Sequence, residues 1–286
     1  MANKFLRGEP EIFASELGFI EGPAWNRASA TLSLVSINLG HIWTLDRGGR
    51  IIGTIETGGG PNGLALDGEH MLVAQNGGIF GASGQAPAGV QRISGNTVSY
   101  LASHGFVAPN DLCFGPDDRL WITDPETDRA VLEPFEGRLI ALDAVTGATE
   151  TMADKRLFPN GLAFDATGET LFLCLTYPRQ IERFSLTPAG LRSDGIFCEL
   201  TGGRPDGVAL DEDGNLWICT PGSGGLEVFS NEGKFLTRIA FGAGTMTTNC
   251  CFGGPELTDL FVTASGLGQV IRLSTTCRGM PLRRMP

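Results

Sequence analysis

The chain has 286 residues, of which 41 are glycine and only 19% are charged, and its net charge is −11. Such an acidic protein is unsuited to nucleic acid or to an anionic membrane surface, since both require clusters of Lys and Arg. The excess of acidic residues can serve either to attract cations or simply to keep the protein soluble. Seven irregularly spaced Cys predict no disulfide framework, and no run is apolar enough for a signal core or a bilayer span, so we expect a cytoplasmic protein of open oligomeric state.

Six segments share one pattern, in which a polar residue opens a short apolar strand. A possible ring-closing strand at 10–19 precedes the first copy, and 278–286 is expected to be a flexible tail. Trp25 on a first strand, and Trp121 and Trp217 at a shared position on second strands, are expected in the core. The six copies lie at 20–25, 60–67, 108–115, 158–165, 204–211 and 246–253, with second apolar strands at 32–35, 119–123, 169–173, 215–219 and 259–263.

The spacing of the copies predicts the fold. Between 41 and 50 residues separate successive copies, enough for about four short strands each, which is the content of one β-propeller blade. No linker is evident, so we expect a single all-β domain over residues 1–286, a six-bladed β-propeller. Because first strands line the central channel of a propeller, the six opening residues should face one another: Glu21, Asn62, Asn110, Asn160, Asp206 and Thr248.

These opening residues offer only oxygen ligands. Two carboxylates facing each other would repel, and a divalent cation would neutralise both. Oxygen-only sets suit calcium, magnesium or manganese. The alternative is turn chemistry, because Asn-Gly and Asp-Gly are also common turn dipeptides. Turn chemistry does not explain why Glu21 and Asp206 occupy the same repeat position as the amides, so we favour a metal site.

Five motifs in register resemble the regucalcin, gluconolactonase and luciferin-regenerating enzyme family over nearly the whole chain. They are Glu-Gly-Pro-Ala-Trp at 21–25, Pro-Asn-Asp-Leu at 109–112, Phe-Pro-Asn-Gly-Leu-Ala at 158–163, Pro-Asp-Gly at 205–207 and Thr-Asn-Cys-Cys-Phe-Gly-Gly at 248–254. The resemblance implies a six-bladed propeller that binds one divalent cation, commonly calcium. Magnesium, manganese, zinc and iron are the other cations that we consider. It also implies hydrolysis of sugar or aldonic acid lactones.

The resemblance implies roles for individual residues. The family's metal ligands fall on Glu21, Asn160 and Asp206, with Asn110 as a fourth ligand or a close contact, and Asp206 matches the proposed general base. Animal members have Arg where this chain has Ala108, so their substrate preference does not transfer. The Thr-Asp-Pro at 123–125 resembles the bacterial gluconolactonase branch instead.

The site residues suggest a mechanism that the sequence leaves open in part. The cation would polarise the lactone carbonyl, and Asn62 and Asn110 would orient the substrate. Asp206 would accept the proton of the attacking water, but coordination should lower the pKa of Asp206, so a water activated by the metal is the alternative. Asp124, with Glu126 and Asp128 after it, either rims the substrate pocket or belongs to a solvated loop.

Other functions fit the same ring. A different hydrolase such as a phosphotriesterase, or a lyase, could use the same metal, and a binding protein could keep the metal for stability. No Gly-x-Ser-x-Gly elbow is present, which argues against a serine hydrolase. The partner we expect is a small-molecule substrate, and the sequence does not identify which lactone it is.

Overall fold

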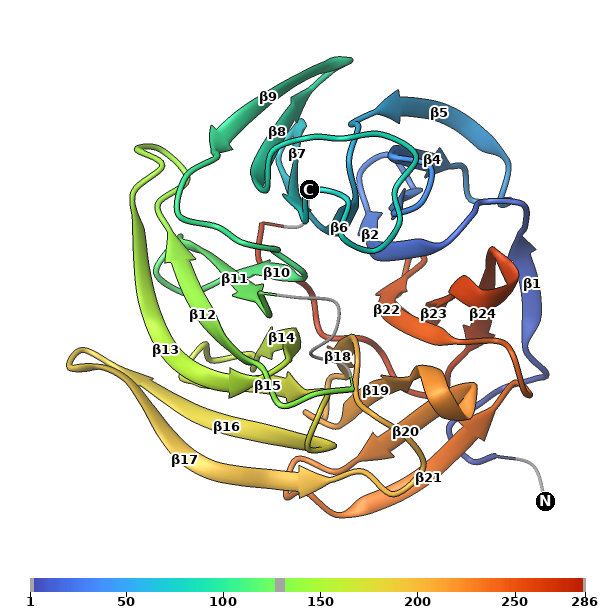
Figure 1. Ribbon diagram of the computed structural model, residues 1–286. Helices are drawn as coiled ribbons and strands as arrows, with labels where there is room; N and C mark the ends of the chain where they lie inside the picture. The colour runs from blue at the N-terminus through green and yellow to red at the C-terminus, as the bar shows by residue number, and fades with distance from the viewer. Residues whose placement is uncertain (1–2, 127–131, 285–286) are drawn as a thin grey trace.

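A computed structural model describes residues 3–126 and 132–284. It shows six four-stranded antiparallel sheets arranged radially around a central axis, as Figure 1 shows. This confirms the predicted all-β, six-bladed propeller. In each of five blades the chain runs outward through four consecutive strands, each of which pairs with its neighbours in the sequence.

The strands of the first three blades are β2 (Ile20–Asn26), β3 (Thr31–Ser36), β4 (His41–Leu45) and β5 (Ile51–Glu56); β6 (Pro61–Asp67), β7 (His70–Gln75), β8 (Gly89–Ser94) and β9 (Thr97–Ala102); and β10 (Leu112–Phe114), β11 (Leu120–Asp124), β12 (Glu136–Leu142) and β13 (Thr149–Leu157). Those of the fourth and fifth are β14 (Pro159–Phe164), β15 (Thr170–Leu175), β16 (Gln180–Thr187) and β17 (Gly190–Glu199); and β18 (Val208–Leu210), β19 (Leu216–Thr220), β20 (Gly225–Phe229) and β21 (Phe235–Ala240). The sixth has β22 (Thr247–Gly253), β23 (Asp259–Ala264) and β24 (Gln269–Ser274), and short 3-10 turns η2 (Pro221–Ser223) and η3 (Ser265–Leu267) follow two second strands.

The sixth blade takes its outer strand from the start of the chain. Strand β1 (Glu11–Ala14) pairs antiparallel with β24, which joins the two ends of the chain in one sheet and closes the ring. β1 lies within the 10–19 segment where the sequence analysis placed a closing strand. Closure matters because an open ring would leave unpaired sheet edges at the gap.

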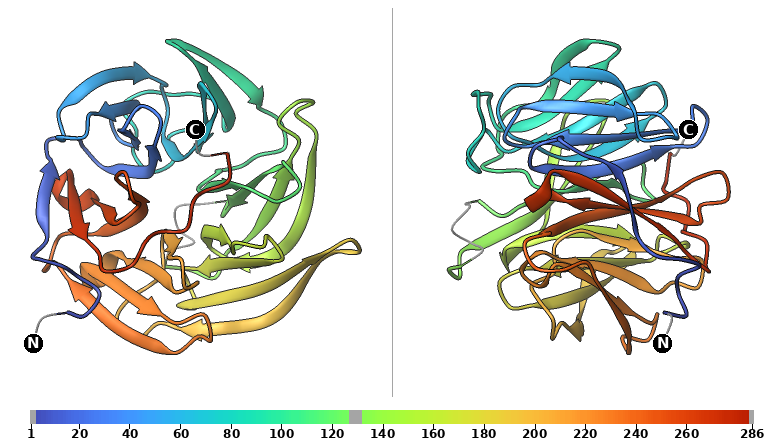
Figure 2. Two further views of the ribbon diagram at one scale, coloured as in Figure 1. Left: turned by 180° about the vertical axis from the view of Figure 1, so that it is seen from behind. Right: turned by 90° about the vertical axis from the view of Figure 1, so that its right-hand side faces the viewer.

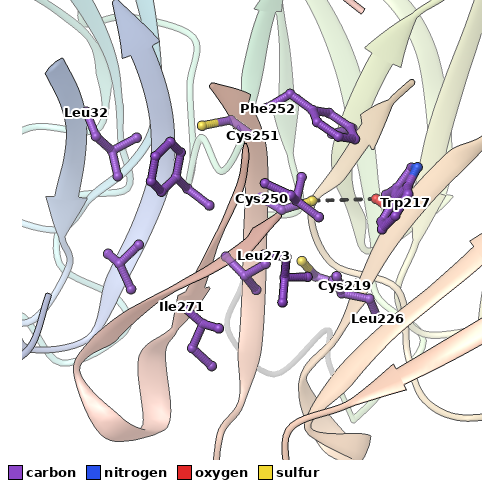
Figure 3. Packing of buried hydrophobic residues seen from close by; sticks show 14 of the residues in the cluster. Leu32, Trp217, Cys219, Leu226, Cys250, Cys251, Phe252, Ile271 and Leu273 are labelled. Carbon is purple, nitrogen blue, oxygen red and sulfur yellow. Dashed lines mark hydrogen bonds between the residues drawn. The ribbon is translucent and has the colours of Figure 1, made fainter. Parts of the chain in front are cut away.

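The core lies between adjacent blades. Side chains alternate between the two faces of a strand, so Leu120 and Ile122 pack toward the second blade while Trp121 packs toward the fourth. Figure 3 shows the largest cluster, which joins the first, fifth and sixth blades and in which Cys250 Sγ lies 3.6 Å from the carbonyl oxygen of Trp217. Trp25, Trp121 and Trp217 are all buried, as predicted. All seven Cys are free thiols.

The C-terminal segment differs from the flexible tail that we expected. Its described part, residues 278–284, crosses the centre of the ring, as the left view of Figure 2 shows. Met280 N donates to the carbonyl oxygen of Leu210 at 2.9 Å, and Arg284 forms an ion pair with Asp67 at 2.8 Å. Repeat logic misses these contacts because the tail lies outside the repeat. Within the described residues, no helix is long and apolar enough to cross a lipid bilayer.

Candidate metal and active site

The six opening residues of the inner strands, here called the polar ring, are brought together around the axis. Three backbone hydrogen bonds link neighbouring blades at this level: Gly63 N donates to Asn110 O at 2.6 Å, Gly161 N to Asp206 O at 3.1 Å, and Gly207 N to Thr248 O at 2.7 Å. Each bond joins the residue after one ring member to the carbonyl of the next. These bonds tie three of the six neighbouring pairs of inner strands together at the level of the polar ring, which separate turns would not do.

Glycine follows four of the ring residues because the neighbouring blade approaches the backbone there. A Cβ on Gly63 would lie 2.8 Å from Asp111 Cα, and one on Gly22, which has φ +52°, would lie 2.6 Å from Asn62 O. A side chain at either position would push the blades apart. The Gly in the repeated motif thus serves the packing of the ring, which a simple turn would not require.

In the third and sixth blades the residue after the ring member is polar instead of glycine. These two side chains form a second polar layer that the sequence analysis did not identify. Asp111 and Asn249 follow Asn110 and Thr248, and Asn249 Nδ2 donates to Asp111 Oδ2 at 3.3 Å. Their blades are the third and the sixth, which stand opposite each other in a six-bladed ring, so the pair bridges the channel directly behind the polar ring. The signal was present in the sequence, as the only two non-glycine residues in that column of the repeat.

The two ring acids carry strongly raised pKa values. Burial, and then the charge of Asp111, raise the pKa of Glu21 to about 8. Hydrogen bonds with Gly22 N and with the side chains of Asn249 and Thr248 lower this pKa in part. Burial and then the charges of Glu21 and Asp111 raise the pKa of Asp206 well above its ordinary value, while the nearby Asn160 amide acts in the opposite direction. Burial is the largest cause of both shifts, and the charge of Glu21 contributes to the shift of Asp206, so the two carboxylates lie within electrostatic range of each other.

Asp111 belongs to the same electrostatic group. Burial raises its pKa to about 6, and its bonds with Leu112 N and Asn249 oppose this. Across the described chain, Glu21, Asp206 and Asp111 form no ion pair with a Lys, Arg or His. Three carboxylates without a basic partner are a costly arrangement, because no positive side chain offsets their mutual repulsion.

The amide donors are oriented by their neighbours. Asn160 Nδ2 donates to Thr176 Oγ1 at 3.0 Å, and Thr176 Oγ1 donates to Pro205 O at 2.7 Å, so Asn160 keeps its Oδ1 for another ligand. The amides of Asn62 and Asn110 are buried and have no hydrogen-bond partner within residues 3–126 and 132–284. The Thr248 hydroxyl instead bonds with Ser265, Thr263 and Ile20 O.

This donor set suits a hard cation, although it is not a cluster of acids and imidazoles. In the described residues, no group of three or more His, Cys, Asp and Glu side chains is placed to hold a metal. A cation at the ring would therefore combine the carboxylates of Glu21 and Asp206 with amide oxygens, which calcium accepts readily.

Asp124 occupies a different kind of place from the ring residues. It is fully buried, and its carboxylate accepts hydrogen bonds from Val107 N at 3.0 Å and Ala108 N at 2.7 Å. Arg138 forms an ion pair with it at 2.8 Å. These partners make Asp124 a support for the segment that leads to Asn110. Glu126 is exposed, and Asp128 lies outside the described residues.

A ring of oxygen-bearing side chains at the opening of six inner strands places this chain in the class of propellers with a polar site on the axis. Residues 19–266 match the model of the SMP-30/Gluconolactonase/LRE-like region, and the chain belongs to that family. It is 26% identical to a gluconolactonase of Zymomonas mobilis, covering 94% of this chain and 82% of the relative. It is 28% identical to a 6-deoxy-6-sulfogluconolactonase of Pseudomonas putida, covering 86% and 82%. The crystal structure of a calcium-binding protein, regucalcin, from Agrobacterium tumefaciens has the same fold, with a TM-score of 0.77 and 21% identity over 94% of this chain and 93% of that one.

Proposed function

We propose that this protein is a metal-dependent lactonase that opens a sugar or aldonic acid lactone at the polar ring. The observation that carries the proposal is the closeness of Glu21, which is buried, to the half-buried Asp206, whose pKa the charge of Glu21 raises, while no described Lys, Arg or His pairs with either acid. Membership of a lactonase family and two sugar lactonases among the relatives support the substrate class.

The residues present fit one divalent cation, with calcium preferred. Glu21 and Asp206 would neutralise its charge, the Oδ1 of Asn160 would complete the set, and Asn110 would lie beside it as a fourth ligand or a close contact. Calcium prefers six to eight oxygen ligands and tolerates irregular geometry, which suits a mixed set of carboxylates and amides. The calcium-binding neighbour of the same fold agrees with this choice.

The chemistry divides among the ring residues. When bound, the cation supplies Lewis-acid polarisation of the lactone carbonyl. Asp206 accepts a proton as a water oxygen bonds to the carbonyl carbon, and the proton passes to the ring oxygen when the ester C–O bond breaks, which yields the hydroxy acid. The free amides of Asn62 and Asn110 hydrogen-bond to substrate hydroxyls. Asp124 positions Asn110 indirectly, because its carboxylate binds the backbone N–H groups of Val107 and Ala108, which precede Asn110 in the chain.

The test combines a substrate panel with metal analysis. The chelated protein is assayed with glucono-δ-lactone, five-membered sugar lactones and a phosphotriester, alone and with calcium, magnesium, manganese, zinc or iron. We expect lactone hydrolysis that a divalent cation restores, and little phosphotriester turnover. Full lactone turnover in chelator, or turnover of the phosphotriester only, would contradict the proposal.

The role of Asp206 needs a separate variant. Asp206→Asn is measured for metal content and for lactone turnover, with Asp165→Asn, a carboxylate in a turn of the fourth blade, as the control. We expect Asp206→Asn to lose at least about 100-fold in kcat, which is the scale of a general base. Normal metal content together with full turnover would remove Asp206 as the base.

A further inference from the structure

Behind the polar ring the channel widens into a cavity that lactone hydrolysis does not use. Its volume is about 340 Å³, and residues of all six inner strands line it on the side where those strands end. Large apolar side chains form most of the wall, among them Trp25, Leu66, Phe114, Phe164, Leu210 and Phe252. A volume of this size is in the range of small-molecule sites.

The C-terminal segment forms the outer wall of this cavity. Residues 280–283 line it, as the segment crosses the centre of the ring in Figure 2. The segment is held on both sides. Gly279 N donates to Leu257 O at 2.7 Å, and Arg284 lies over the Phe114 ring at 4.3 Å while it pairs with Asp67. The cavity therefore has a fixed outer wall made by the chain itself.

One cation on this wall has no partner. Arg283 lines the cavity, and within the described chain it makes no hydrogen bond and no ion pair, whereas the adjacent Arg284 pairs with Asp67 and Asp118. An unpaired guanidinium beside an apolar cavity is a ready partner for an anion, because Arg binds carboxylates through two parallel hydrogen bonds.

A second unpaired donor lines the same cavity, on the inner strand β2. The indole Nε1 of Trp25 is buried and has no hydrogen-bond partner in the residues described. The other three tryptophans all donate: Trp43 to Leu17 O, Trp121 to Asp117 and Trp217 to Asp211, each at 3.0 Å. Buried indole N–H groups usually find an acceptor, so the exception at Trp25 points to an acceptor supplied from outside the chain.

The charges also set the direction in which a ligand would lie. Asp111 and Asn249 line the inner end of the cavity, next to the polar ring, and Arg283 lies on the outer wall. Asp165 also lines the cavity, but its carboxylate already accepts hydrogen bonds from Gly168 N and Thr170 N. A carboxylate is repelled at the inner end and attracted at the outer one. We propose that this cavity binds a small monocarboxylic acid with an apolar body, its carboxylate paired with Arg283, at a site separate from the polar ring.

The experiment measures binding and not turnover, so its failure is distinct from failure of the lactonase proposal. Isothermal titration calorimetry of the full chain is run with octanoate and with the neutral analogue 1-octanol, on the wild type and on Arg283→Gln. The control is Arg50→Gln, which removes the same charge from an arginine paired with Asp46 far from the cavity.

We expect octanoate to bind the wild type and Arg50→Gln alike, and Arg283→Gln to weaken it about tenfold without changing octanol binding, as for loss of a charge-assisted hydrogen bond. Absence of octanoate binding to the wild type would overturn the proposal. It would also be overturned by octanol binding as tightly as octanoate, or by equal effects of the two substitutions.

Discussion

Replacing Glu21 by Gln should stabilise the metal-free protein and destabilise the metal-bound one. Burial, and then the charge of Asp111, raise the pKa of Glu21 from 4.5 to about 8. The folded chain therefore holds a proton on Glu21 that the unfolded chain releases between these values, so the free energy of unfolding falls as pH rises through this window. At 1.36 kcal/mol per pKa unit, the full loss by pH 8 is about 5 kcal/mol.

The neutral amide of Gln removes this penalty because it carries no charge to bury. We therefore expect Glu21→Gln in chelator to gain most at the alkaline end of the window, by up to about 5 kcal/mol, and to gain almost nothing near the acidic end. With calcium present the sign should reverse, because the wild-type carboxylate then has a cation as partner and the variant lacks a ligand.

The assay is urea unfolding followed by tryptophan fluorescence, at several pH values between about 4.5 and about 8.5, in chelator and in excess calcium. Glu182→Gln is the matched control. Glu182 is also buried, but Arg156 pairs with it at 2.8 Å, so its loss should destabilise the protein in both conditions. Destabilisation of the chelated protein by Glu21→Gln at the alkaline end, or an effect of the same sign with and without calcium, would refute the reasoning.

Three further predictions concern the scaffold of the site. Gly63→Ala should cost about 2 kcal/mol in thermal unfolding and lower turnover, because its Cβ would lie 2.8 Å from Asp111 Cα; unchanged stability would show that the blades can separate freely. Asp124→Asn should cost about 3 kcal/mol, because it leaves Arg138 without its buried partner, and raise KM more than it lowers kcat; a selective loss of kcat would instead indicate contact with the reacting atoms. Deletion of residues 1–14 removes β1 from the sixth blade and should lower the melting temperature well below that of the full chain, whereas an unchanged melt would exclude ring closure as a source of stability.

Much of the fold could be predicted from the sequence because every blade of a propeller has the same pattern of polar and apolar residues. Each copy supplies a polar opening residue, a glycine or its substitute, and an apolar strand, so the blade number follows from counting copies. The polar ring follows from the same logic, since Glu21 and Asp206 share a repeat position and a radial fold brings that position to one axis.

Features outside the repeat, or dependent on its exceptions, could not be predicted in this way. The bridge between Asp111 and Asn249 needs two blades to stand opposite each other across the channel. The sequence left Asp124 either at the rim of the pocket or in a solvated loop, and the structure shows a fully buried carboxylate that Val107 N, Ala108 N and Arg138 contact. The path of 278–284 depends on contacts with Leu210 and Asp67, which no local pattern encodes.

The sequence by itself determined the number of blades and the repeat position that carries oxygen-bearing side chains, because these depend on local patterns repeated at regular spacing. Tertiary structure alone decided how strongly the two ring acids repel, since pKa shifts arise from burial and from the distance between side chains far apart in the chain. It also decided that the channel ends in a cavity walled by the C-terminal segment, because only packing brings residues 280–283 against all six inner strands.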